Sequence, residues 1–200
     1  MGIGAGKTTL LNYLCGKMLA NNLRSDGHTF VNGKSTKESR NYLQFTAFVQ
    51  QEDILLETLT VQECLEFASK LKFSSDPKQR KAKVEDLLEE LELKDARDIR
   101  FGGIRKRGRL LSCGEKKRLS IAVELITNPS LLFLDEPTTS MDTFTAEKII
   151  RIICKLQQQG RTIIATIHQP NTEIFNQFDQ LMILSLGKVV YQVSAKDKEQ

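Results

Sequence analysis

The last third of the chain alternates short apolar runs with helical segments, and this alternation limits the possible fold more than any other feature. Apolar strands are predicted at residues 131–134, 162–167, 181–185 and 189–192, with helices at 144–158 and 172–178 between them. Continuous apolar strands that are separated by helices are typical of a buried, mostly parallel sheet. The sequence therefore predicts an α/β fold in which helices flank the sheet.

The middle of the chain, from about residue 55 to 127, is predicted to be an inserted helical subdomain. Thr60-Val61-Gln62-Glu63 has the pattern of a capping box, which starts a helix that runs to about Lys72. Asp76-Pro77 starts a second helix, because proline is favoured in the first helical turn. Ser112 starts a third, which runs to about Thr127.

The first fifty residues supply one helix and two strands. The helix is predicted from Thr8 to about Ala20, from leucines at helical spacing. The strands are predicted at 28–31, closed by a hairpin-type Asn32-Gly33 turn, and at 45–50.

Composition places the chain among ordinary globular proteins. Its 200 residues suffice for one domain with a core, predicted over 1–192, before a charged tail at 193–200. The net charge of +4 is mild, and the densest basic stretch, 100–109, is broken by glycines and reads as a solvated loop, so nucleic-acid binding is not expected. The four cysteines are widely spaced, which fits a reduced setting rather than a zinc site. No apolar run approaches the ~20 residues that span a bilayer.

A glycine-rich segment, Gly4-x-Gly6-Lys7-Thr8, directly precedes the first predicted helix. Glycines let backbone N–H groups crowd around phosphate oxygens, and the helix directs its positive end at the same anion. Lys7 is expected to reach the β- and γ-phosphates, Thr8 to ligate Mg²⁺, and Thr9 to contribute to phosphate binding. The alternative is a glycine-rich turn without a ligand.

Two carboxylates follow the apolar run 131–134, where ligands bind in open α/β sheets. We expect Asp135 to hold Mg²⁺ through water and Glu136 to orient or deprotonate the attacking water. His168 ends the strand 162–167 at the same edge of the sheet. A contact with the γ-phosphate is expected for it, and a merely structural histidine is the alternative.

The start of the third middle helix can be interpreted in two ways. Ser112-x-x-Glu115 is a plain capping box. A Ser-Gly helix start is also an anion site, so Ser112 and Gly114 become candidates for nucleotide binding. If the helical region forms a separate arm, this start serves the phosphate loop of a second, head-to-tail copy.

These motifs, in this order, resemble the nucleotide-binding domain of ATP-binding-cassette (ABC) proteins over residues 2 to about 192. The matching segments are a Walker A loop (Gly2–Thr9), a Q-loop (Gln51), a signature (Leu111–Glu115), a Walker B strand (Leu131–Glu136), a D-loop (Thr139–Asp142) and a switch histidine (His168). The resemblance implies a P-loop NTPase fold with Mg-ATP as its ligand. It also implies that Gln51 ligates Mg²⁺, and that Ser112 and Gly114 close on ATP held by a second nucleotide-binding domain.

The sequences around the motifs are similar to those of the G, or White, subfamily of half-transporters. The matching stretches are 51–55, 59–63, 115–125 and 166–170, together with Phe178-Asp179. The resemblance implies ATP-driven transport of lipids, sterols, pigments or drugs, with the domain joined to a transmembrane domain at the cytoplasmic face of a membrane.

Four departures from the family pattern keep a second hypothesis open. Met1 occupies the position of a glycine in the phosphate loop, and Cys113 replaces a signature glycine. Arg109-Leu110 resembles an insertion before the signature, and Ser140-Met141 replaces a Gly-Leu pair. The strand that should precede the loop is also absent from the sequence. The alternative is a truncated or degenerate nucleotide-binding module without ATPase activity. A soluble ABC ATPase of DNA repair or translation would want a coiled-coil insertion or a second cassette, which the sequence lacks.

Overall fold

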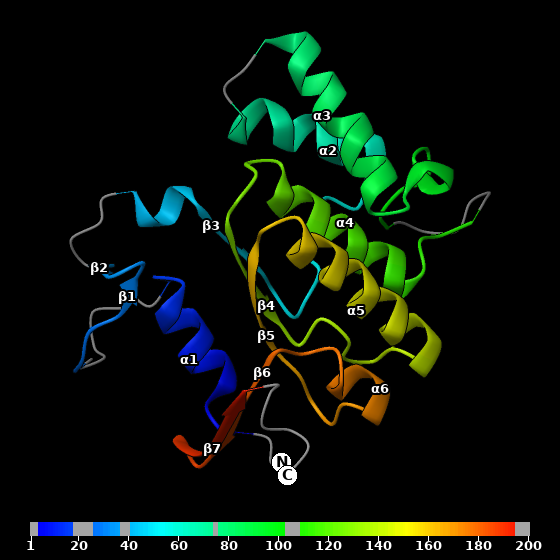
Figure 1. Ribbon diagram of the computed structural model, residues 1–200. Coiled ribbons are helices and arrows are strands. Elements are labelled where there is room, and N and C mark those ends of the chain that lie inside the picture. Colours follow the sequence, from blue (N-terminus) through cyan, green and yellow to red (C-terminus); the bar gives the residue numbers. More distant parts are fainter. Residues whose placement is uncertain (1–3, 18–25, 37–40, 74–75, 103–108, 195–200) are drawn as a thin grey trace.

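A three-stranded parallel sheet lies at the centre of the computed structural model, which describes residues 4–17, 26–36, 41–73, 76–102 and 109–194. The strands β3 (Thr46–Val49), β4 (Leu131–Asp135) and β5 (Thr162–Thr166) pair in that order (Figure 1). Every residue of β4 is buried, as expected for a central strand covered on both faces. The predicted parallel sheet with flanking helices is confirmed for these strands. The predicted strands at 181–185 and 189–192 do not join it, and they form a separate antiparallel sheet instead.

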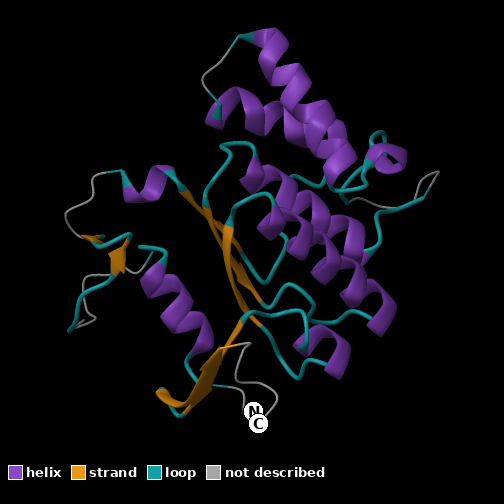
Figure 2. Ribbon diagram, viewed as in Figure 1, coloured by secondary structure: helices purple, strands orange, loops and turns teal. Residues whose placement is uncertain are grey.

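Helices cover both faces of this sheet (Figure 2). On one face lies α1 (Lys7–Leu14), which contacts β4 and β5. On the other face lie α4 (Cys113–Leu125), against β3, and α5 (Thr143–Gln158), against β5. The short α6 (Thr172–Phe175) packs on α5. This layering brings the carboxyl ends of the strands and the start of α1 to one edge of the sheet.

Two further helices form an arm above the sheet in Figure 1, α2 (Val61–Lys72) and α3 (Pro77–Glu90), followed by a 3-10 turn at Lys94–Ala96. The core is continuous from this arm into the sheet, because Leu65 and Leu87 belong to the same buried cluster as Leu132. The helix α4 contacts α2 and α3 as well as β3 and α5. It therefore joins the arm to the sheet.

Two antiparallel hairpins complete the described fold. The first pairs β1 (Phe30–Val31) with β2 (Lys34–Ser35) through the predicted Asn32-Gly33 turn, where both residues have positive φ. The second pairs β6 (Gln180–Ser185) with β7 (Lys188–Ser194). Its turn contacts the glycine-rich loop, because the Gly187 amide donates a hydrogen bond of 3.1 Å to the Ala5 carbonyl. A 3-10 turn at Tyr42–Gln44 precedes β3.

The first helix is shorter than its leucine pattern predicts. α1 ends at Leu14, and the prediction that it continues to about Ala20 is wrong, although residue 20 itself lies outside the described residues. Gly16 takes a φ of +77° and donates its N–H to the Tyr13 carbonyl, while Lys17 donates to the Asn12 carbonyl. These two bonds form a Schellman motif, which stops a helix at a left-handed glycine.

The predicted helix 172–178 is also shorter than expected. Its regular part ends at Phe175, and the next residues continue with tighter bonds, such as Gln177 N–H to the Ile174 carbonyl. Such bonds commonly close a last turn. Residues 1–3, most of the basic loop (103–108) and the end of the charged tail (195–200) lie outside the described residues.

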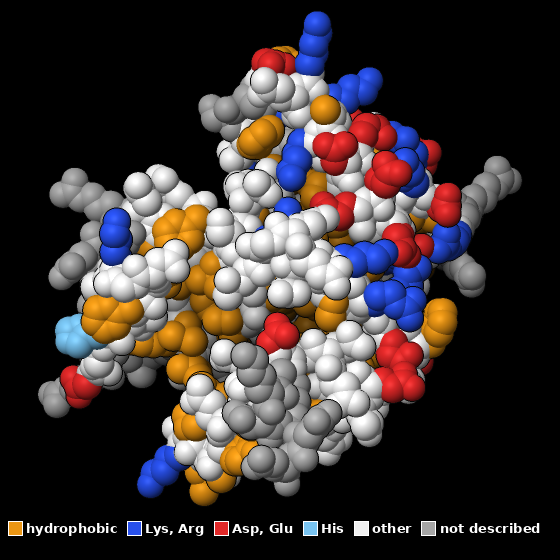
Figure 3. Space-filling view, viewed as in Figure 1, with side chains coloured by type: hydrophobic (Ala, Val, Ile, Leu, Met, Phe, Trp, Pro, Cys, Tyr) orange, Lys and Arg blue, Asp and Glu red, His pale blue; other side chains and the backbone are white. Residues whose placement is uncertain are grey.

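Charged and apolar side chains separate on the face shown in Figure 3. Lysines, arginines and acids gather over the arm and α4, whereas apolar side chains gather in the hollow between the α1 side of the molecule and the sheet. Ile164 of β5 and Met182 of β6 are among the exposed apolar residues. Within the described part of the chain, every helix is too short or too polar to cross a membrane.

Candidate functional site

The glycine-rich loop meets α1 in a conformation that leaves the helix start open. Gly4 and Gly6 have φ of +87° and +91°, a region that residues with a Cβ rarely adopt. No side chain caps the start of α1, so its first N–H groups point outward without a side-chain acceptor. Such a start, with the positive end of the helix dipole, suits a phosphate group.

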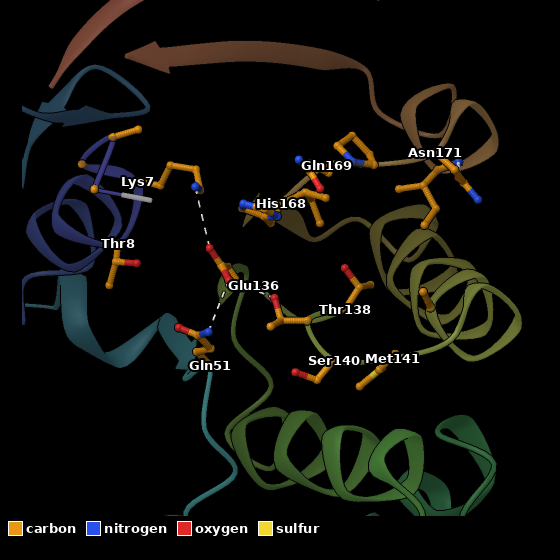
Figure 4. Close-up of a pocket in the computed structure, with 18 of the residues that line it drawn as sticks. Lys7, Thr8, Gln51, Glu136, Thr138, Ser140, Met141, His168, Gln169 and Asn171 are labelled. Carbon is orange, nitrogen blue, oxygen red and sulfur yellow. Dashed lines mark hydrogen bonds and ion pairs between the residues drawn. The ribbon is translucent and has the colours of Figure 1, made fainter. Parts of the chain in front are cut away.

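A pocket of about 740 Å³ opens in front of this loop (Figure 4). Its walls come from the loop and the start of α1, from Gln51 after β3, from the segments after β4 and β5, and from the start of α6. The structure thereby brings together most of the predicted site residues around one cavity: Gly4, Gly6, Lys7, Thr8, Thr9, Gln51, Glu136 and His168.

Asp135 lies behind the pocket wall, tied to two hydroxyl groups. Its side chain is buried, and its Oδ1 accepts hydrogen bonds from Thr8 Oγ1 at 3.2 Å and from Thr166 Oγ1 at 2.6 Å. Thr166 Oγ1 in turn accepts a bond of 2.8 Å from the Glu136 amide. One threonine thus fixes both carboxylate residues. Sequence reasoning did not select Thr166, because only the pairing of Asp135 with Thr166 across β4 and β5 reveals it.

Glu136 is held by partners from two other segments and by one from its own turn. Its carboxylate lies 3.7 Å from Lys7 Nζ and accepts hydrogen bonds from Gln51 Nε2 at 3.3 Å and Thr139 Oγ1 at 2.9 Å (Figure 4). Its φ of +45° is unusual for a residue with a side chain. Backbone strain of about 1–3 kcal/mol persists only where surrounding contacts fix it, and it gathers at functional sites.

His168 lies just beyond β5 and faces the same pocket as Lys7 and Glu136 (Figure 4). The next residue, Gln169, has a φ of +46°, so the chain turns sharply at this point. The turn directs the segment 168–171 along the pocket wall and into α6. Cation, carboxylate and imidazole therefore surround one cavity.

Ser112 and Gly114 are not among the residues that line this pocket. Ser112 caps α4: its Oγ accepts the Glu115 amide at 3.3 Å, while its own amide donates to Glu115 Oε2 at 2.8 Å. Arg109 forms an ion pair with the other carboxylate oxygen. Burial opposes ionisation of Glu115, but the bonds from Ser112 and the Arg109 charge outweigh it and lower the pKa of this carboxyl. The predicted capping box is thus formed.

Gly114 has a packing role of its own. A β-carbon at this position would lie 2.6 Å from Cγ2 of Thr145, in the first turn of α5. The starts of α4 and α5 therefore touch, and only a glycine fits between them. Ser112 and Cys113 are exposed beside this contact. The exposed Ser112 and Cys113 therefore lie beside the contact between α4 and α5, and neither lines the pocket.

The donor set of the pocket fits a magnesium nucleotide. Hydroxyl, carboxylate and amide oxygens, as on Thr8, Asp135 and Gln51, are the ligands that Mg²⁺ prefers, and Lys7 supplies a cation for phosphate. Among the described residues, no cluster of three or more His, Cys, Asp or Glu side chains has the geometry to hold a metal by itself. Mg²⁺ rarely needs one, since it is usually held by one or two protein groups, waters and substrate phosphates.

The fold combines a parallel sheet, a glycine-rich loop that starts a helix, and an Asp-Glu pair at the end of β4. These features together define a P-loop nucleotide-binding domain. Known proteins share this arrangement. A family model for the ABC transporter matches residues 2–139. One solved structure, cbiO1 of Clostridium perfringens, part of the ABC transporter complex cbiONQ, superposes with a TM-score of 0.80 and 25% identity, over 98% of this chain and 76% of that one.

A second solved structure is a dimeric post-hydrolysis state of the ATP-binding cassette MJ0796 bound to ADP and Pi. It superposes with a TM-score of 0.72 and 23% identity, over 96% of this chain and 81% of that one. This likeness supports the fold alone.

Curated relatives include ABC transporter G family member 7 of Arabidopsis thaliana, 44% identical over 191 residues, and the ABC transporter ATP-binding protein/permease wht-3 of Caenorhabditis elegans, 41% identical over 191 residues. Each alignment covers 94% of this chain but only 26% and 30% of the two relatives. The chain belongs to the ABC transporter family, and the predicted resemblance to its G-type members is confirmed.

Proposed function

We propose that this chain binds Mg-ATP in the pocket before α1 and hydrolyses it, as the ATPase part of a G-type transporter. The observation that carries the proposal is the convergence of two separate segments on Glu136, with Lys7 at 3.7 Å and Gln51 at 3.3 Å, while Thr139 of its own turn donates to it at 2.9 Å. A carboxylate held this way beside a phosphate-binding lysine suits a group that orients water for phosphoryl transfer.

Each predicted site residue has a role in this proposal. Gly4, Gly6 and Thr9 offer backbone donors to the phosphates, and Lys7 offers its ammonium group. Thr8, Gln51 and Asp135 are the groups for Mg²⁺, which when bound neutralises charge on the phosphate oxygens. Glu136 orients or deprotonates the attacking water, and His168 contacts the γ-phosphate.

The α4 start supports a site shared between two copies. Ser112 and Cys113 are exposed, and Ser112 lies outside the pocket of its own chain. In a head-to-tail pair this start would contact the nucleotide of the neighbour through Ser112 and Gly114. The partners proposed are therefore a second nucleotide-binding domain and a transmembrane domain, with no nucleic acid.

The transport role rests on the curated relatives, of which this chain covers less than a third. One of them is named as both an ATP-binding protein and a permease. We propose that the chain works at the cytoplasmic face of a membrane and drives the movement of a lipid-like or other small substrate.

A second candidate is a nucleotide-binding module without ATPase activity. Cys113 favours it, because this exposed side chain stands at the α4 start where the family has glycine. Calorimetric titration with Mg-ATP, combined with a phosphate-release assay, separates the two. Tight binding without phosphate release supports the second candidate.

The direct test of the first candidate is ATP turnover by the Glu136→Gln variant. The amide keeps the size of the side chain but removes its basicity, so turnover is expected to fall by about 100-fold or more. Glu173→Gln is the matched control, because Glu173 is an exposed acid at the start of α6 outside the pocket lining. Unchanged turnover in Glu136→Gln would show that Glu136 has no catalytic role.

A further inference from the structure

A buried lysine on α4 holds the segment that carries Gln51. The Lys117 side chain is only 4% exposed. Its Nζ lies 3.1 Å from the Gln50 carbonyl, 2.9 Å from the Gln51 carbonyl and 2.7 Å from Asp53 Oδ1. An ammonium group has three donors, and these three acceptors use all of them.

A second α4 residue strengthens the same contact. Ser120 Oγ donates a hydrogen bond of 2.8 Å to the same Asp53 Oδ1. Lys117 and Ser120 are three residues apart and therefore share one face of the helix. We call Lys117, Ser120, Asp53 and the two glutamine carbonyls the α4 clamp.

The clamp and the proposed catalytic site meet at one residue. The Gln51 carbonyl accepts from Lys117, and the Gln51 side chain donates to Glu136 at 3.3 Å. Gln51 is thus fixed from α4 on one side and contacts the catalytic carboxylate on the other. The direction of the Gln51 side chain depends on where α4 lies.

The same helix also begins at the shared-site residues. Ser112 is five positions before Lys117, about 7.5 Å along the helix axis. α4 is regular from Cys113 to Leu125, and its start is fixed by the Ser112–Glu115 box. One continuous helix therefore links the α4 start to the Gln51 segment.

We propose that Lys117 is a positioning residue that keeps Gln51 against Glu136 and transmits displacement of the α4 start to the chain's own nucleotide pocket. This proposal deepens the proposed function and rests on it. A lysine that only stabilised the arm would not be expected to act through Gln51.

Lys117→Met tests the clamp, because it removes the three donors and keeps most of the side-chain length. Lys116→Met is the matched control: it loses the same charge on the same helix, but Lys116 Nζ lies over the Phe101 ring, 5.1 Å from its centroid. Lys117→Met is expected to lower ATP turnover about tenfold and to raise the Mg²⁺ concentration for half-maximal turnover about tenfold, with Lys116→Met within about twofold of wild type.

A double-mutant cycle with Gln51→Ala separates positioning from general destabilisation. If Lys117 acts through Gln51, the double variant has the turnover and Mg²⁺ dependence of Gln51→Ala alone, within about twofold. If the two losses multiply, Lys117 has an effect independent of Gln51 and the proposal is overturned. Melting temperatures measured alongside report any loss of stability, which a positioning role does not require.

One readout does not depend on ATP hydrolysis. The chain has no tryptophan, so an Ile54→Trp background places one probe beside the clamp, at a side chain that is 72% exposed. Lys117→Met in this background is expected to lower the fluorescence anisotropy of the probe, and Lys116→Met is not. Lowered anisotropy in Lys117→Met supports the clamp even if the wild-type chain shows no ATP turnover, which would contradict only the proposed function. Unchanged anisotropy in Lys117→Met overturns the clamp.

Discussion

The starts of α1 and α4 differ in whether a side chain caps their free backbone N–H groups. Each helix begins with backbone N–H groups that have no partner inside the helix. α1 begins after Gly6, in a left-handed conformation with no side-chain cap. α4 begins with Ser112, whose capping box with Glu115 is complete. The open start borders the pocket of its own chain, whereas the closed start lies outside it.

The start of α2 shows that a capping box by itself does not make a functional site. α2 begins with the same box, in which the Thr60 amide donates to Glu63 Oε2 at 2.8 Å and the Glu63 amide donates to Thr60 Oγ1 at 3.2 Å. This box borders no pocket wall of the proposed site. A capping box alone therefore carries no function, and any function of Ser112 comes from where α4 places it.

The largest effect is expected at the open start. Lys7→Met removes the cation that faces the pocket, so the affinity for Mg-ATP measured by calorimetry should fall by about 100-fold or more. Lys17→Met, just beyond the C-terminal end of α1, is the control: the Lys17 ammonium lies over the Phe48 ring, so this variant should bind normally. Equal losses in both variants would contradict a specific role for the open start.

The next effect concerns the packing of the closed start. Gly114→Ala forces a β-carbon against Cγ2 of Thr145, and we expect it to lower the free energy of unfolding by about 1–3 kcal/mol in urea titrations. Thr145→Ser removes that methyl group but keeps the hydroxyl that donates to Asp142. The double variant should regain most of the stability, and a double variant no better than Gly114→Ala would show that the clash is not the cause.

The two capping boxes should differ in function but not in stability. Ser112→Ala and Thr60→Ala each remove a cap and should each lower the free energy of unfolding by about 1 kcal/mol. Only Ser112→Ala is expected to lower the maximal ATP turnover, about tenfold, with Mg-ATP binding to the single chain unchanged. If ATP turnover falls equally in Ser112→Ala and Thr60→Ala, the α4 start has only a structural capping role.

The smallest effect is a pH dependence at the closed start. The pKa of Glu115 is lowered in the folded state, so its stabilisation is present above the unfolded value of about 4.3 and is lost as the pH falls through the folded value. Glu115→Gln should flatten the fall in unfolding free energy below about pH 4.5 in urea titrations. Because Thr60 also lowers the pKa of Glu63, Glu63→Gln should show a similar change. An unaltered slope in Glu115→Gln would mean that its cap does not depend on its charge.

Local patterns predicted much of this fold, and long-range contacts supplied the rest. The capping boxes at Thr60 and Ser112, the Asn32-Gly33 turn and the apolar strand before Asp135 are each visible within a few residues, and all are present. The end of α1 was missed because the Gly16 stop signal lies within a continuing leucine pattern.

Local sequence patterns could not predict the contacts that fix Asp135 and Glu136, because their partners lie far away in the sequence. Thr166 contacts Asp135 only because β4 and β5 pair in one particular register. Lys117 holds the Gln51 carbonyl across 66 positions of sequence. The sequence selected the groups that bear the chemistry, and the structure adds the groups that position them.

In the proposed head-to-tail dimer, the open start of α1 serves the chain's own nucleotide and the closed start of α4 serves the neighbour's. Mixing two inactive variants, Lys7→Met and Ser112→Arg, tests it most directly, since their mixed dimer would hold one intact shared site. If the two starts form shared sites, the mixture regains about a quarter of the wild-type ATP turnover, because about half of random pairs are mixed and each has one working site of two. A mixture as inactive as its two components would rule out shared sites.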